Sequence, residues 1–324
     1  MERDLKKILT PLNDYLAQVD REIKKRLEIG IPIIDQSAMH LFTSGGKRIR
    51  ASLVILTSGL KTEIPAGIIE LAAATEIIHA ASLIHDDIID QSLFRRGNIT
   101  VPQKWGNKVA VLVGDFMYSM ALHIAIQDGN TALFPLMVSG TKDMIMGELY
   151  QLQFSDIETI RREHYLSIVE LKTARFMGSC AKLGGTKSDL SSGECEELYN
   201  FGLNLGFAFQ IIDDTFDIMH NPSQIGKDVG SDLKDGKITL PILYLIEQGG
   251  VSDLNRLKKY SSEPNANEWE KIKKRLVESG AISHSVDFAG SYIDKARDIL
   301  KKFPDSQFRN MLFELSDFLL NRKY

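Results

Sequence analysis

Two short acidic motifs contain the residues whose type and spacing point most directly to chemistry. They are DDIID at Asp86–Asp90 and DDTFD at Asp213–Asp217, each in an otherwise apolar stretch. On a helix, residues four apart share a face, so the first and last aspartates of each motif point the same way. Carboxylates buried together without a partner repel one another and cost several kcal/mol. The pair of motifs therefore predicts a bound cation.

The donor types predict which cation this is. No Cys or His is interleaved with the six carboxylates, so a hard, oxygen-seeking ion such as Mg²⁺ is favoured. Mg²⁺ keeps several waters and commonly shares its coordination sphere with phosphate, which indicates a phosphorylated substrate. One motif alone would be better explained as a solvated helix end. Two motifs together with nearby basic residues favour metal binding.

Basic residues accompany both acidic motifs and also lie near the N-terminus. The segment GGKRIR, at 45–50, puts three cations after two glycines and just before an apolar helix. Glycines permit close approach, a helix N-terminus offers N–H groups to an anion, and arginine forks suit phosphate. Arg95 and Arg96 follow the first motif, while Lys227, Lys234 and Lys237 follow the second. Taken singly, each set could be a basic helix cap or a charged surface network.

Three further positions give weaker signals. Lys172 and Thr173 lie inside an expected helix, and Gln210 shares a helical face with Asp213. The spacing Glu76-x-x-His79 is typical of di-iron carboxylate bundles, but that site needs a second Glu-x-x-His, which the sequence lacks. We expect His79 to donate a hydrogen bond near the acidic cluster, with an ordinary core histidine as the alternative.

Composition restricts the class of protein. The 324 residues are 44% hydrophobic and 25% charged, with a net charge of −4 and a pI near 6.0, which gives no reason to expect a nucleic-acid partner. Two cysteines, Cys180 and Cys195, lack metal-ligand spacing and favour a reducing cytosol. The charged N-terminus does not resemble a signal peptide. Because Asp115 and His123 interrupt the longest apolar run, we expect a soluble, cytoplasmic protein without a transmembrane segment.

Apolar residues recur at helical spacing through most of the chain. Helices are predicted at 68–89, 133–154, 166–183 and 194–218, with three shorter ones between 267 and 324. Glycine and proline predict breaks at 43–46, 95–98, 184–185, 220–222, 249–250 and 263–264. No linker divides the sequence. We therefore expect a single all-α domain spanning residues 1–324.

These motifs, taken in order, resemble those of the trans-prenyltransferases that make polyprenyl diphosphates. GGKRIR, IIHAASLIHDDIID, RRG, GDF, KTA, FQIIDDTFD and GKDVGSDLKDGKITLP all match, and GELYQL is similar to the long-chain bacterial members. The resemblance implies the isoprenoid synthase helical bundle around a large central cavity, and a homodimer. One departure is Ala51, where the family often has proline.

The resemblance also implies roles for individual residues. Two to three Mg²⁺ ions would be held by Asp86, Asp87, Asp90, Asp213, Asp214 and Asp217. The allylic diphosphate would be bound by Arg95, Lys172, Thr173, Gln210 and Lys227, of which Lys172 and Lys227 join Asp86, Asp90 and Asp213 as catalytic residues. Isopentenyl diphosphate would be bound by Lys47, Arg50, His79 and Arg96.

Small side chains near the first motif predict a medium or long product. If the growing tail runs along the 68–89 helix, Ser82 lies on the face below Asp86, Ala81 lies beside it, and no aromatic residue blocks the way. That face continues through Ile78, Thr75, Ala74 and Leu71, which gives about 22 Å of open depth at 1.5 Å per residue. We expect an octaprenyl-like chain, made from farnesyl diphosphate for a ubiquinone or menaquinone side chain.

Three alternatives stay open. A short-chain geranylgeranyl or farnesyl diphosphate synthase would be expected to carry a bulky side chain near Ala81 or Ser82. A terpene cyclase would be expected to replace the second DDxxD and to lack Lys47 and Arg50. A non-catalytic subunit of a heteromeric synthase could lose its acidic residues, whereas this chain has all six.

Overall fold

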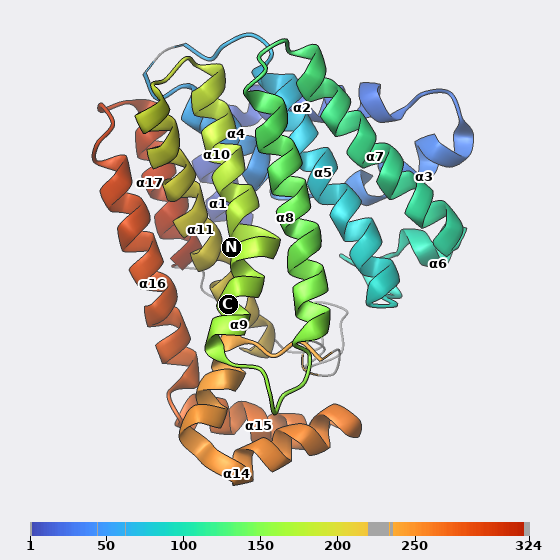
Figure 1. The fold of residues 1–324 in the computed structure, drawn as a ribbon, viewed down its shortest axis with the longest axis vertical. Coiled ribbons are helices and arrows are strands. Elements are labelled where there is room, and N and C mark those ends of the chain that lie inside the picture. The colour runs from blue at the N-terminus through green and yellow to red at the C-terminus, as the bar shows by residue number, and fades with distance from the viewer. Residues whose placement is uncertain (1, 44, 62, 220–232, 234–235, 321–324) are drawn as a thin grey trace.

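The computed structural model describes residues 2–43, 45–61, 63–219, 233 and 236–320, and it is a bundle of long helices (Figure 1). The first half contains α1 (Glu2–Leu9), η1 (Thr10–Leu12), α2 (Asn13–Leu27), α3 (Pro32–Thr43), α4 (Ile49–Ser58), α5 (Ile68–Ile89), β1 (Phe94–Arg95), β2 (Asn98–Ile99), α6 (Val101–Trp105), α7 (Asn107–Gln127) and α8 (Leu133–Gln153). The second half contains α9 (Arg162–Val169), η2 (Glu170–Ala174), α10 (Arg175–Lys187), α11 (Ser192–Met219), α14 (Leu240–Ser262), α15 (Ala266–Glu278), α16 (Ala281–Leu300) and α17 (Gln307–Leu320). The all-α prediction is confirmed for the described chain.

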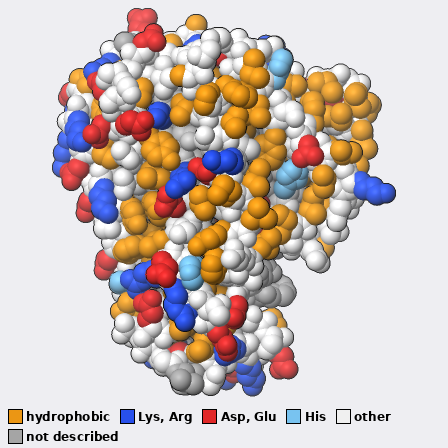
Figure 2. Space-filling view, viewed as in Figure 1, with side chains coloured by type: hydrophobic (Ala, Val, Ile, Leu, Met, Phe, Trp, Pro, Cys, Tyr) orange, Lys and Arg blue, Asp and Glu red, His pale blue; other side chains and the backbone are white. Residues whose placement is uncertain are grey.

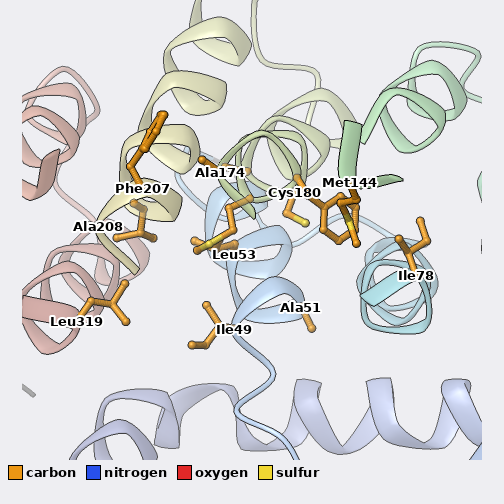
Figure 3. Packing of buried hydrophobic residues seen from close by; sticks show 14 of the residues in the cluster. Ile49, Ala51, Leu53, Ile78, Met144, Ala174, Cys180, Phe207, Ala208 and Leu319 are labelled. Carbon is orange, nitrogen blue, oxygen red and sulfur yellow. The ribbon is translucent and has the colours of Figure 1, made fainter. Parts of the chain in front are cut away.

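The core forms where α4, α5, α10 and α11 pack side by side. Helix α5 is apolar on nearly all sides, as a central helix must be, and α4 is buried along its whole length. Figure 3 shows side chains of α4, α5, α8, α10, α11 and α17 meeting in one cluster, with Cys180 among them. The acidic motifs therefore end helices that are held rigidly by the core.

Gly184 and Gly185 do not break a helix, so that prediction was wrong. Helix α10 continues through them to Lys187. A Cβ on Gly184 would lie 2.2 Å from the Thr57 hydroxyl oxygen, and one on Gly185 would lie 2.6 Å from a Leu198 methyl. These glycines let α10 approach α4 and α11 closely. The break predicted at 249–250 is confirmed, because Gly250 has φ +65° inside α14.

A small hairpin follows the first acidic motif. Strands β1 and β2 pair Arg95 with Asn98, which leaves Arg96 and Gly97 as a two-residue turn. Both turn residues have positive φ, 52° and 78°, as such hairpins require. The turn carries Arg96 towards the GGKRIR segment, where its guanidinium donates to the carbonyl of Gly45.

Helices α7 and α8 expose an apolar face. Figure 2 shows hydrophobic side chains gathered over this part of the molecule. They include Val111, Leu112 and Ile126 of α7 with Val138, Ile145, Met146, Leu149 and Leu152 of α8. By length and composition, α5 and α7 are apolar enough to cross a bilayer, contrary to our expectation, but core helices pass the same test. In this fold α5 is mostly buried and packs against one side of α7, whose other side is exposed.

Candidate active site

A cavity of about 1100 Å³ brings the acidic and basic residues together. Its acidic end holds Asp86 from α5 and Asp213 from α11, and its basic end holds the loop before α4. Among the residues predicted from the sequence, the lining includes Lys47, Arg50, His79, Ser82, Asp86, Arg95, Arg96, Lys172, Thr173, Gln210 and Asp213. Residues from five separate stretches of sequence thus face one space.

The three aspartates of the first motif have different surroundings. Asp87 is buried, and its Oδ1 accepts a hydrogen bond of 2.7 Å from Nε of Arg95. Asp90 is the C-cap of α5, and its Oδ2 accepts a hydrogen bond of 2.5 Å from Nζ of Lys237. Asp86 faces the cavity, with Nζ of Lys172 3.9 Å from its Oδ2. Asp86 is therefore the member of this motif that is presented to a ligand.

Burial raises the pKa of Asp86 to about 6, from an ordinary value of 3.8. The positive charge of Lys172 opposes this rise, while the negative charges of Glu148 and Asp90 add to it. A carboxylate with this raised pKa lacks sufficient favourable contacts for its negative charge. A cation bound at Asp86 would supply them.

The second motif is built into a hydrogen-bonded network. The Asp214 carboxylate accepts from the hydroxyl of Tyr165 at 2.6 Å and from the amide of Gln210 at 2.8 Å. Gln210 in turn accepts from the Thr173 hydroxyl at 2.8 Å. The network fixes Gln210 and Thr173 beside Asp213 at the cavity wall. Both residues were predicted to bind the same diphosphate, and the structure places them in contact.

A single turn of π-helix, η2, positions Lys172 and Thr173. The extra residue in this turn bulges the backbone towards α8 and α11. Two glycines make room for it: a Cβ on Gly147 would lie 2.6 Å from the Lys172 nitrogen, and a Cβ on Gly206 would lie 2.5 Å from Cα of Ala174. The ammonium of Lys172 forms an ion pair with the buried carboxylate of Glu148. The continuous α-helix predicted at 166–183 is therefore interrupted where Lys172 and Thr173 lie.

The basic end of the cavity contains His79 surrounded by arginines. Burial, together with the positive charges of Arg50, Arg96, Arg95 and Arg48, lowers the pKa of His79 well below its ordinary value. A neutral imidazole can donate one hydrogen bond to a phosphate oxygen. The Arg50 guanidinium lies 5.9 Å from the ring centre of Phe176, and its Nε has no hydrogen-bond partner among the described residues.

The N-terminus of α4 differs from its predicted role. We expected its N–H groups to face an anionic substrate. Instead, the N–H of Ala51 donates to Oε1 of Glu76, a buried residue of α5, at 3.1 Å. Arg48 is the N-cap residue, has φ +48°, and makes no side-chain cap. A protein carboxylate thus already occupies one of the N–H groups of this helix end.

The open face predicted below Asp86 is only partly present. Ser82 lines the cavity, but Ala81, Ile78, Thr75, Ala74 and Leu71 are 0–1% exposed and packed into the core. The space next to Asp86 is bounded instead by Tyr118 of α7 and by Met144, Ile145, Leu149 and Leu152 of α8. Since side chains of the bundle fill the upstream face of α5, the open space next to Asp86 lies towards α7 and α8.

The structure tests the metal prediction only in part. Within the described residues, no three Asp, Glu, His or Cys side chains are grouped so that they could hold a metal ion by themselves. The oxygen donors nevertheless fit Mg²⁺, which takes one or two carboxylates and completes its sphere with water and phosphate oxygens. Asp86 and Asp213 both face the cavity. Lys227 and Lys234 lie outside the described residues, as does the break predicted at 220–222.

Sequence reasoning missed several contacts of the site. Tyr165 holds Asp214, Glu148 holds Lys172, and Lys237 bridges to the first motif although it follows the second. Glu148 lies in the GELYQL stretch, which carried a family resemblance but no assigned role. Each partner is far away along the chain, so spacing alone gave no signal for it.

A family model described as polyprenyl synthetase matches residues 31–279. The chain belongs to this family. It is 31% identical to heptaprenyl diphosphate synthase component 2 of Bacillus subtilis, over 97% of this chain and 89% of the relative. It is 30% identical to octaprenyl diphosphate synthase of Escherichia coli, over 97% and 99%. A crystal structure of polyprenyl synthase from Caulobacter crescentus, complexed with calcium and isoprenyl diphosphate, aligns with a TM-score of 0.93 at 31% identity, covering 99% of this chain and 98% of that one.

Membership of the polyprenyl synthetase family confirms three predictions. The fold is the all-α isoprenoid synthase fold, the chain is an enzyme, and its class is prenyltransferase in isoprenoid synthesis. Its homologues include relatives named for heptaprenyl and octaprenyl products.

Proposed function

We propose that this chain condenses isopentenyl diphosphate with an allylic diphosphate in a Mg²⁺-dependent reaction and repeats the step to make a long all-trans polyprenyl diphosphate. The observation that carries the proposal is the single cavity with an acidic end and a basic end. The allylic substrate loses its diphosphate in the reaction, whereas isopentenyl diphosphate keeps its own and must be held by it. The two ends have the charges for these two tasks.

At the acidic end, Lys172, Thr173, Gln210 and Arg95 bind the allylic diphosphate, and Lys227 is proposed to join them. Mg²⁺, held by Asp86, Asp90 and Asp213 with help from Asp87, Asp214 and Asp217, supplies positive charge to this diphosphate when bound. The ammonium of Lys172 lies beside Asp86 and Glu148. From this position it can stabilise the negative charge that develops on the leaving diphosphate.

At the basic end, Lys47, Arg50, His79 and Arg96 hold isopentenyl diphosphate. The C1–O bond of the allylic substrate breaks, the bonding electrons leave with the diphosphate, and an allylic cation remains. The double bond of isopentenyl diphosphate then attacks C1 of this cation, which leaves the positive charge on the isopentenyl unit. A proton is then lost from C2 of the isopentenyl unit to the released diphosphate, which leaves an allylic product five carbons longer. Met144 and Phe209 contribute apolar walls that keep water from the cation.

We propose farnesyl diphosphate as primer and an octaprenyl chain as product, used for a quinone side chain. The small Ser82 beside Asp86 and the long-chain relatives support this length. Tyr118 of α7 lines the same cavity, and a tail that stopped there would favour the short-chain alternative. We also propose a cytoplasmic, single-domain protein.

Product analysis tests the proposal. Purified protein is incubated with Mg²⁺, labelled isopentenyl diphosphate and farnesyl diphosphate, and the dephosphorylated products are sized by chromatography. We expect a linear C40 product and none when EDTA replaces Mg²⁺. A C15–C20 end product would support a short-chain synthase, a cyclised hydrocarbon would reject the proposal, and no turnover would reject elongation by this chain alone.

We further propose that two copies pair through α7 and α8. Leu112 and Leu149 are 69% and 62% exposed on the apolar face. Ile145, Leu149 and Leu152 also line the cavity, so a second copy would close one of its walls. Leu112→Asp is expected to convert a dimer into monomers in sedimentation experiments, whereas Val277→Asp on the distant α15, at 52% exposure, is the control.

A heteromeric assembly is the second candidate. The Bacillus subtilis relative is named component 2, which favours a partner subunit of a different sequence. The intact acidic motifs argue that this chain would be the catalytic component. If purified protein elongates farnesyl diphosphate without any added protein, no second component is needed for catalysis.

A further inference from the structure

We infer that Glu76 is a positioning residue that assembles the pocket for isopentenyl diphosphate. This inference rests on the proposed function. Glu76 was set aside in the sequence because its Glu-x-x-His spacing lacked a second copy for a di-iron site. In the structure it lies on α5, one turn before His79, and lines the basic end of the cavity.

The carboxylate of Glu76 connects α5 to the GGKRIR segment. The residue is 5% exposed. Its Oε1 accepts the Ala51 N–H at 3.1 Å, and its Oε2 lies 3.8 Å from a terminal nitrogen of Arg48. Ala51 is the third residue of α4. The backbone N–H at this position ordinarily donates to the side chain of the N-cap residue. Glu76 therefore replaces a local cap with one from another helix.

This remote cap is needed because the local residue cannot provide it. The N-cap position is held by Arg48, which has no acceptor atom. Arg48 instead has a left-handed backbone, and its Nε donates to Asp20 at 2.8 Å while its guanidinium lies over the ring of Phe42. The backbone turn at Arg48 sets the directions of Lys47 and Arg50 on either side. Holding Arg48 and Ala51 thus fixes both cations that are proposed to bind the diphosphate.

The charges around Glu76 fit the same role. Burial lowers the pKa of Arg50, and the negative charge of Glu76 is the largest influence that opposes this lowering. Without this carboxylate, the positive charges of Arg48, Arg50 and Arg96 would be gathered in the pocket with less compensation. Glu76 allows the pocket to stay assembled before the substrate arrives.

Three variants separate hydrogen-bond acceptance from charge. Glu76→Ala removes both and is expected to weaken isopentenyl diphosphate binding about tenfold or more, the effect of losing a hydrogen bond to a charged acceptor. Glu76→Gln keeps an amide oxygen for Ala51 but removes the negative charge, so its loss of binding should be measurable and smaller than that of the alanine variant. Glu76→Asp keeps the charge but withdraws it by one methylene, so it should resemble the alanine variant. If Glu76→Ala does not fold, the Glu76→Asp variant replaces it in the comparison.

The readouts are calorimetric binding of isopentenyl diphosphate and KM for each substrate at a temperature where melting curves show folded protein. KM for isopentenyl diphosphate should rise in the alanine and aspartate variants, with kcat and KM for farnesyl diphosphate nearly unchanged. Glu70→Ala, on the same helix, is the matched control. Equal loss for both substrates, unchanged binding in the alanine variant, or a glutamine variant as weak as alanine would each overturn the inference. A wild-type protein that binds no isopentenyl diphosphate would instead reject the proposed function, and this inference with it.

Discussion

Replacing Asp86 by Asn is expected to stabilise the metal-free protein and to abolish turnover. Burial raises the pKa of this carboxyl from 3.8 to about 6. Between these values the folded chain holds a proton that the unfolded chain has lost, so stability falls as pH rises from about 4 to 6. Above pH 6 the loss is complete, and at 1.36 kcal/mol per pH unit it reaches about 3 kcal/mol. Asparagine carries no charge, so the Asp86→Asn protein does not lose this stability as pH rises.

Thermal melting in EDTA measures this difference. At pH 7.5 we expect Asp86→Asn to melt about 6 °C above wild type, taking about 2 °C per kcal/mol for a chain of this size. At pH 4.5 the two proteins should melt within about 2 °C of each other, because Asp86 is then largely protonated. The comparison is made at one protein concentration, since assembly also shifts melting.

Asp90→Asn is the matched control from the same motif. Its carboxylate accepts a hydrogen bond from Lys237 at 2.5 Å, so neutralising it removes a favourable contact and should leave stability unchanged or lower. Adding Mg²⁺ with inorganic diphosphate should stabilise wild type by about 2.7 kcal/mol at a hundredfold excess over Kd, and should stabilise Asp86→Asn much less. An Asp86→Asn protein that is no more stable than wild type at pH 7.5 would refute the reasoning.

The remaining predictions concern chain length and the π-helical turn. Ser82→Phe should shorten the product, because Ser82 lines the cavity, whereas Ala81→Phe should mainly lower the melting temperature, because Ala81 is fully buried in the core. An unchanged product distribution in Ser82→Phe would contradict this path for the tail. Gly147→Ala should lower kcat at least tenfold, since its methyl would meet the backbone of Lys172 at 2.6 Å, while Gly193→Ala, with open space around it, should have no effect in the same assay.

The fold was predictable wherever hydrophobic periodicity is strong. The 68–89 helix was predicted with its observed ends, because glycine precedes it and the apolar spacing is continuous. Prediction failed at Gly184 and Gly185, where the glycines serve contact between helices rather than a turn. It also missed the π-turn, since one extra residue in a helix leaves no mark in an apolar pattern.

The site was predictable where the chemistry is local in sequence. The two motifs and the arginines that follow the first are short patterns, and the structure brings one aspartate of each motif, Asp86 and Asp213, to one cavity with both arginines. The partners Tyr165 and Lys237 were missed because they contact the motifs from distant segments. Glu76 was misread for the same reason: its function depends on α4, whose approach to α5 no spacing rule predicts.

The carboxylates of the two motifs are therefore not equivalent, although their spacing makes them look so. Asp87 is joined to Arg95, Asp90 to Lys237, and Asp214 to Tyr165, contacts that hold a hairpin, a loop and a neighbouring helix in place. Asp86 instead lies near Lys172, whose ammonium is shared with Glu148. Contacts within the protein thus satisfy the first three carboxylates more fully than Asp86. Burial raises the pKa of Asp86, and the single ammonium of Lys172, which also serves Glu148, opposes this rise only in part.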